Sequence, residues 1–197
     1  MGCSSPHTKE RYPVSQGPLL LLFCCIFLFD QPGNLIGEAI DGVHFFIDDY
    51  LFQRAWNDPC RYAHLLSGYQ AVMTPDFSMF TDYPVAVQLY NHWRKHLLGA
   101  YWQSLGLTVI PSICWSDHDS YAWCFDGEPV GGTVAVSSVG TQKNPLARAL
   151  FLDGYAEMMR RLQPEKIIFF GDVPAGCTGN IEPHEPYYRG VHAKRRC

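Results

Sequence analysis

Short apolar runs alternate along this chain with longer segments that carry helix signals. Five of the runs have the length and composition of buried strands, and polar residues follow each of them. These runs cover residues 43–47, 69–73, 107–110, 133–136 and 166–170. Alternation of strands and helices is typical of parallel sheets, because parallel strands need a long crossover connection. The pattern predicts an α/β domain with about five mainly parallel strands, in an open sheet or an incomplete (β/α) barrel.

The segments between the runs have recognisable helix starts and stops, such as proline in a first turn and glycine after a last turn. They predict helices at 58–67, 84–105, 118–125 and 145–163. The second of these is the clearest, since its apolar residues recur at spacings of three and four. The residues expected to face the sheet are Ala86, Leu89, Tyr90, Trp93, Leu97, Ala100 and Tyr101.

The same pattern divides the chain into three parts. Residues 1–42 are expected to form an N-terminal extension with an apolar run and a linker, 43–172 the α/β domain, and 173–197 an irregular C-terminal tail. The apolar run at 19–29 is too short for a membrane helix, which needs about 20 residues. A buried first strand, a membrane-seeking extension and an export signal all remain open for this run.

The composition of the chain argues against some classes of partner and favours one cellular compartment. The formal net charge of −4 does not favour bulk binding of nucleic acid. The eight cysteines contain no CxxC pair, so neither a zinc ribbon nor a dithiol redox motif is indicated. Scattered cysteines in a chain of 197 residues are typical of reduced core positions, which predicts a cytoplasmic protein.

An ordered series of short motifs resembles a family found in prophages and mobile elements, domain of unknown function 4417. The motifs are FFIDDY at 45–50, TPDFS at 74–78, YWQ at 101–103, VIP at 109–111, Trp115, CFDG at 124–127 and VAVS at 134–137. The resemblance covers roughly residues 43–172. It implies a bacterial or phage protein that works in the cytoplasm, and it brings no activity with it.

Carboxylates follow the first two predicted strands. Asp48 and Asp49 follow the first run, and Asp76 follows the second. Because the carboxyl ends of parallel strands meet at one edge, these side chains are expected to converge there. They would bind Mg²⁺ or Mn²⁺ through oxygen ligands, or act as general acid and base. The alternative is structural: Asp48 or Asp49 caps a helix, and Asp76 forms a turn with the backbone.

Other residues near the strand ends have the chemistry to hold a substrate. Ser137 and Ser138 precede a helix, where backbone amides can hold a phosphate, although an ordinary strand-to-helix turn is the favoured explanation for them. Ser78 follows Asp76, and Trp115 can stack on a base or a sugar. Arg94 lies on the long helix and can clamp a carboxylate or hydrogen-bond a loop.

A histidine pair on the long helix is a weaker signal. His92 and His96 lie four residues apart, which places both on one helix face as a metal pair requires. No HExxH pattern accompanies them, and the neighbouring Lys95 indicates a solvated face.

Two functions from different classes fit these observations. The first is a metal-assisted enzyme that acts on a nucleotide, a phosphoester or a nucleic-acid end, with Asp48, Asp49 and Asp76 at its centre. The second is a non-catalytic accessory module that binds a small ligand or a host protein. A purely structural reading of the aspartates is the third possibility, and the sequence does not decide whether the chain is an enzyme.

Overall fold

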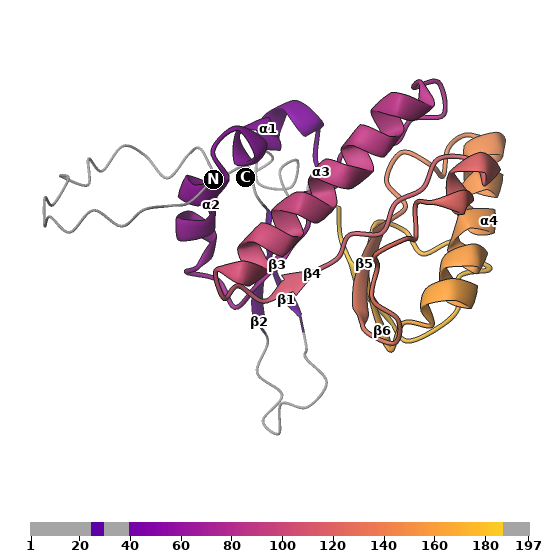
Figure 1. Ribbon diagram of the computed structural model, residues 1–197. Helices are drawn as coiled ribbons and strands as arrows, with labels where there is room; N and C mark the ends of the chain where they lie inside the picture. Colours follow the sequence, from indigo (N-terminus) through magenta and orange to yellow (C-terminus); the bar gives the residue numbers. More distant parts are fainter. Residues whose placement is uncertain (1–24, 30–39, 187–197) are drawn as a thin grey trace, which may run out of the picture.

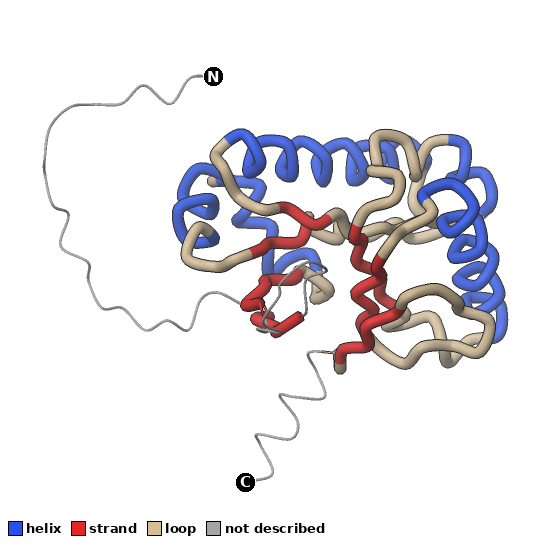
Figure 2. Tube along the Cα trace, turned by 90° about the horizontal axis from the view of Figure 1, so that it is seen from below, coloured by secondary structure: helices blue, strands red, loops and turns tan. Residues whose placement is uncertain are grey.

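The computed structural model describes residues 25–29 and 40–186, in which helices lie along the outside of a curled sheet (Figures 1 and 2). The strands are β1 (Cys25–Phe29), β2 (Ile40–His44), β3 (Ala71–Met73), β4 (Val109–Ile110), β5 (Thr133–Ser137), β6 (Lys166–Phe170) and β7 (Ile181–His184). The helices are α1 (Asp49–Asn57), α2 (Pro59–Leu66), α3 (Val85–Ser104), the 3₁₀ helix η1 (His118–Ala122) and α4 (Pro145–Leu162).

The strands follow one another across the sheet in chain order. β1 pairs antiparallel with β2, and β2, β3 and β4 pair in parallel. β5, β6 and β7 form a second parallel ladder. A parallel bridge between Ser112 and Ala135 connects the two ladders just beyond β4. The predicted fold class, an α/β domain with mainly parallel strands, is therefore confirmed.

The two faces of the sheet pack against different partners. On the outer face, Val43 and Val72 belong to one core with helices α1 to α3, and Val134 and Ile167 belong to a second core with α4. On the inner face, side chains from β3 to β6 form a single cluster that spans both ladders. The His44 ring lies 4.3 Å from the Phe170 ring, although three strands separate β2 from β6. The sheet is curled like a barrel, and no ladder closes it within the described residues.

Several elements differ from the sequence-based expectation. β2 occupies 40–44 rather than 43–47, because the chain turns after it, with Ile47 N donating to Phe45 O at 2.8 Å. The segment 49–57, which carried no predicted element, forms α1. β7 lies within the segment expected to be an irregular tail, and it pairs along the open edge of β6. Edge pairing depends on β6 and leaves little local signal in the sequence.

The N-terminal apolar run contributes a strand to the sheet. Residues 25–29 of the run form β1, paired along the whole of β2, and residues 19–24 lie outside the described residues. For 25–29 the strand alternative is therefore the observed one. None of the helices in the described parts of the chain is long and apolar enough to cross a membrane.

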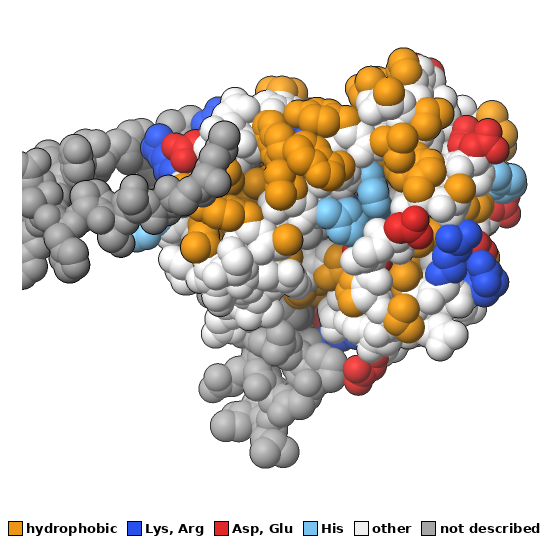
Figure 3. Space-filling model, viewed as in Figure 1, with side chains coloured by type: hydrophobic (Ala, Val, Ile, Leu, Met, Phe, Trp, Pro, Cys, Tyr) orange, Lys and Arg blue, Asp and Glu red, His pale blue; other side chains and the backbone are white. Residues whose placement is uncertain are grey.

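Helix α3 buries its polar side and exposes its apolar side, the reverse of the prediction. Its buried side chains are Gln88, Asn91, Arg94, Lys95, Leu98 and Trp102, with Gly99. Most of the predicted core stripe is exposed, including Leu89, Tyr90, Trp93 and Leu97, and an apolar surface runs over this helix (Figure 3). The polar side can be buried because its side chains hydrogen-bond neighbouring loops and helix α1, which offsets the loss of hydration.

Candidate functional site

A cavity of about 450 Å³ lies at the carboxyl ends of the central strands, where the sequence predicts a site. We call it the strand-end cavity. It is lined by residues that follow β2, β3, β4 and β5 and by the first turns of α4. A second cavity of about 390 Å³ shares Asp76, Ser78 and Ser137 with it and extends to Asp48. Residues far apart in the sequence therefore meet at one edge of the sheet.

Asp76 is the acidic residue among those that line the strand-end cavity. Burial raises the pKa of its carboxyl group to about 7, against the opposing effects of Lys95 and of a side-chain hydrogen bond from Cys114. Burial also raises the pKa of the Cys114 thiol well above its ordinary value. Near neutral pH the Asp76 carboxyl group therefore gains and loses a proton, whereas the neighbouring Cys114 thiol stays protonated.

A buried ion pair lies behind this carboxyl group. Lys95 Nζ is 2.5 Å from Glu128 Oε1 and donates a second hydrogen bond to Ser112 O at 3.0 Å. Both side chains are only 1% exposed. Burial alone would lower the pKa of Lys95 and raise that of Glu128, but their mutual attraction has the larger effect in each case. Both groups are therefore charged at neutral pH. The positive charge of the Lys95 ammonium group attracts the ionised form of Asp76 and so opposes the rise in its pKa.

A second polar cluster fixes the loop that carries Asp76. Asp49 accepts hydrogen bonds from Ser78 N at 3.1 Å and from Ser78 Oγ at 2.8 Å. Asn91 Nδ2 donates to Ser78 O at 2.6 Å. Arg94 stacks 3.5 Å above the Phe77 ring and lies 3.8 Å from Asp49. The carboxylate of Asp49 is occupied by these contacts, so it positions the loop.

The predicted site residues divide into three groups in the structure. Asp76, Ser78, Trp115 and Ser137 line the strand-end cavity. Asp48 is exposed, makes no side-chain cap to α1 and lines the second cavity. Behind the walls lie Asp49, Arg94 and Ser138, the last donating through Oγ to Asp172 O at 2.7 Å.

The shared metal site at Asp48, Asp49 and Asp76 stays a prediction. Within the part of the chain that the structure describes, the ligand-type side chains that come within 4.8 Å of one another as a trio are His92, His96 and Glu128. Burial lowers the pKa of His92 to about 4, so this imidazole is neutral at pH 7.

The sequence reasoning missed three residues of this region. Lys95 is expected on a solvated face, and Cys114 and Glu128 have no predicted role in the site. A usable signal existed in the polar stripe of Gln88, Asn91 and Lys95, whose spacing places all three on one side of α3. When a helix has a polar stripe on one side and an apolar stripe on the other, either side can be the buried one. Only the partners that the surrounding loops offer decide which side is buried.

Trp115 forms part of the cavity wall because a glycine leaves room for its ring. The indole Nε1 donates to Leu150 O at 3.3 Å, and a Cβ atom on Gly154 would overlap the indole. Gly154→Ala is therefore expected to displace Trp115 and to lower the free energy of unfolding by about 1–3 kcal/mol. Urea unfolding monitored by tryptophan fluorescence measures this change. Gly68→Ala is the matched control, because the added methyl group there has only ordinary contacts. Equal stability of the Gly154→Ala variant and the wild type would contradict the expectation.

The chain matches a family described as a domain of unknown function, DUF4417, over residues 26–182. It belongs to this family. It is 44% identical to the Gene 1 protein of Mycobacterium phage L5 over 131 residues, which cover 66% of this chain and 57% of the phage protein. It is 42% identical to the Gene 1 protein of Mycobacterium phage D29 over 145 residues, which cover 73% and 54%. The chain spans little more than half the length of these relatives, and no solved structure matches it.

The DUF4417 match confirms the predicted resemblance and extends it at both ends. It begins within β1 and ends within β7, whereas the motifs in the sequence indicated 43–172. Strands β2 to β6 fall wholly inside the matched region, which also includes parts of β1 and β7. The strand-end cavity is thus built entirely from DUF4417 residues.

Proposed function

We propose that the strand-end cavity binds a small uncharged heterocycle, such as a nucleobase or a nucleoside, and that Asp76 exchanges a proton with it. The observation that carries this proposal is the Asp76 carboxyl group in the cavity, with its pKa raised to about 7 by burial. A general acid or base is most effective when its pKa lies near the working pH.

The size and lining of the cavity support a ligand of this class. A volume of about 450 Å³ lies in the range that small-molecule sites occupy. Aromatic rings from Phe46, Trp115 and Phe151 line it together with hydroxyl groups such as those of Thr81 and Ser116. Its lining residues include neither lysine nor arginine, so a phosphate group in the cavity would meet the carboxyl group of Asp76 without contacting a cationic side chain. Flat rings with polar edges suit aromatic and hydroxyl walls.

The ionisation states also favour proton transfer over nucleophilic catalysis. The raised pKa keeps Cys114 as a thiol, whereas a cysteine nucleophile must be a thiolate. The ammonium group of Lys95 is held by Glu128 and Ser112. With Cys114 and Lys95 excluded, Asp76 is the group of the three that changes its charge near pH 7.

A divalent metal ion is the second candidate, and it rests on the shared position of two carboxylates. Asp48 and Asp76 line the second cavity together with Ser78 and Ser137, all of which offer oxygen ligands. Mg²⁺ or Mn²⁺ there would supply the positive charge that a phosphate needs. Asp49 would serve such a site by holding Ser78 in place.

A ligand panel tests the first candidate. Nucleobases, nucleosides and nucleoside monophosphates are added singly at pH 6 and pH 8, and the unfolding temperature is measured. Bases or nucleosides are expected to raise it in the wild type, because a ligand that binds only the folded state stabilises it. Asp76→Asn should abolish the rise, while Asp82→Asn, an exposed aspartate outside both cavities, should keep it. No shift with any base or nucleoside would contradict the proposal.

Two additions to this panel separate the remaining alternatives. Chromatography of the incubated ligands reports chemical turnover, which distinguishes an enzyme from a binding module. Repeating the panel with Mn²⁺ reports the metal candidate: a monophosphate that binds only with Mn²⁺, and only while Asp48 and Asp76 are both present, favours that candidate over the first.

The described cysteines support the predicted cytoplasmic location. Cys114, Cys124 and Cys177 carry free thiols, and Cys124 is fully buried in the core beneath α4. Free thiols persist in reducing compartments. We therefore propose that the ligand of this site is a small molecule of the cytoplasm.

A further inference from the structure

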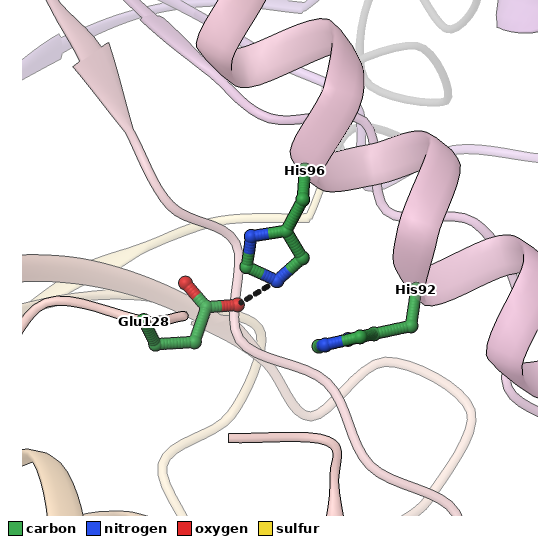
Figure 4. A group of neighbouring side chains, drawn as sticks. All are labelled: His92, His96 and Glu128. Carbon is green, nitrogen blue, oxygen red and sulfur yellow. Dashed lines mark ion pairs between the residues drawn. The ribbon is translucent and has the colours of Figure 1, made fainter. Parts of the chain in front are cut away.

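Two histidines of α3 and one glutamate from the loop before β5 surround a single point in space (Figure 4). One imidazole nitrogen from each histidine and one oxygen of Glu128 all lie within 4.8 Å of one another. His96 Nε2 is 3.2 Å from Glu128 Oε1, and the rings of His92 and His96 are 4.4 Å apart. Both imidazoles extend from the same side of α3, as a spacing of four residues requires.

The cluster contains buried nitrogen atoms that the protein itself does not satisfy. His92 Nδ1 and His96 Nε2 are buried, and neither makes a hydrogen bond of good geometry with the described residues, although Glu128 Oε1 lies 3.2 Å from His96 Nε2. An unsatisfied buried polar atom typically costs about 1–3 kcal/mol, so such atoms need an explanation.

We infer that His92, His96 and Glu128 bind one divalent transition-metal ion, with Zn²⁺ as the best fit. Two imidazoles and one carboxylate are an established ligand set for Zn²⁺, and a fourth position stays open for water or another ligand. Lys95 and the metal ion can share Glu128, because a carboxylate has two oxygens and about four lone-pair sites. His96 is 29% exposed, which gives the ion a route from solvent. The bound ion would join α3 to the loop that precedes β5.

Metal titration of the full chain tests this site. Protein freed of metal with a chelator is titrated with Zn²⁺ in a calorimeter, and with Co²⁺ while the visible absorption is recorded. We expect one ion per chain and a higher unfolding temperature with Zn²⁺. The visible absorption of bound Co²⁺ should be that of an ion with a low coordination number. His92→Gln and His96→Gln should each weaken binding by at least about tenfold. His64→Gln, an exposed histidine on α2, is the matched control and should bind as the wild type does.

The outcomes distinguish this site from other metal binding and from the strand-end cavity. Cysteines can also hold Zn²⁺, so the decisive variant is the double change His92→Gln with His96→Gln. Unchanged affinity and stoichiometry in that variant would overturn the inference, as would an absence of binding in the wild type. Asp76→Asn should still bind one Zn²⁺ per chain. The zinc titration therefore tests the His92, His96 and Glu128 site even if the proposed heterocycle site is wrong.

Discussion

Lys95→Met is expected to destabilise the protein by about 3–5 kcal/mol, because it leaves a buried carboxylate without its cation. Glu128 is only 1% exposed and receives its hydrogen bond from Lys95, and Ser112 O would also lose a donor. A loss of this size is a large fraction of the stability of an ordinary domain. Urea unfolding at pH 7 measures it, and a folded fraction by circular dichroism is recorded first.

A second change keeps this prediction testable if the single variant fails to fold. In the double variant Lys95→Met with Glu128→Met both charges are removed, and most of the lost stability should return, since a buried ion pair contributes little more than an apolar pair. Arg160→Met removes one partner of the surface pair with Glu157 and should have a much smaller effect. Equal losses in the single and double variants would show that lost packing, and not an unpaired charge, is the cause.

Lys95 also illustrates what the sequence reveals about α3 and what it does not. Proline, glycine and the spacing of apolar residues located the helix almost to its ends. They did not reveal its orientation, because the rule that apolar residues face the core assumes that polar ones have no partners inside. Here Gln88, Asn91 and Lys95 bind backbone groups of loops that follow β3 and β4. Those partners lie 5 to 17 residues away, beyond the reach of helix periodicity.

The candidate site was predictable to the same extent. Parallel strands brought the segments after β2, β3 and β5 to one edge, as the alternating pattern predicts, and Asp76 lies in the cavity there. Asp48, Asp49 and Asp76 looked equivalent in the sequence, but the structure gives them different surroundings. Asp49 is tied to Ser78, Asp48 faces solvent, and Asp76 is partly buried with its carboxyl group desolvated. Differences of burial and hydrogen bonding decide their chemistry, and they arise only from the packed fold.

The burial of Asp76 leads to a prediction about pH. In the folded protein its carboxyl group keeps a proton up to a pKa of about 7, whereas the ordinary value is 3.8. Between these values the folded state binds more protons than the unfolded state, so this group makes stability fall as the pH rises from about 4 to 7. Above pH 7 the full destabilisation is present, on the order of 4 kcal/mol for a shift of about three pKa units.

Two buried histidines change the stability in the opposite direction, so that it rises with pH. Burial lowers the pKa of His44 to about 3 and that of His92 to about 4, from an ordinary 6.5. Their contribution to stability is present above pH 6.5 and is lost as the pH falls through those lowered values. The pH profile of the wild type alone therefore mixes both effects, and a difference between two variants is needed to isolate Asp76.

Asp76→Asn isolates this effect, because asparagine resembles the neutral carboxyl group at every pH. The stability of the variant relative to the wild type is expected to rise by several kcal/mol between pH 4 and pH 8, since only the wild type loses stability as Asp76 ionises. Urea unfolding of both proteins in steps of one pH unit gives this difference, with Asp82→Asn as an exposed control that should stay flat. A difference independent of pH would show that Asp76 titrates near its ordinary value. The variant should be more stable at pH 8 and yet fail to bind the heterocycle, as expected where a strained carboxylate serves a ligand site and not the fold.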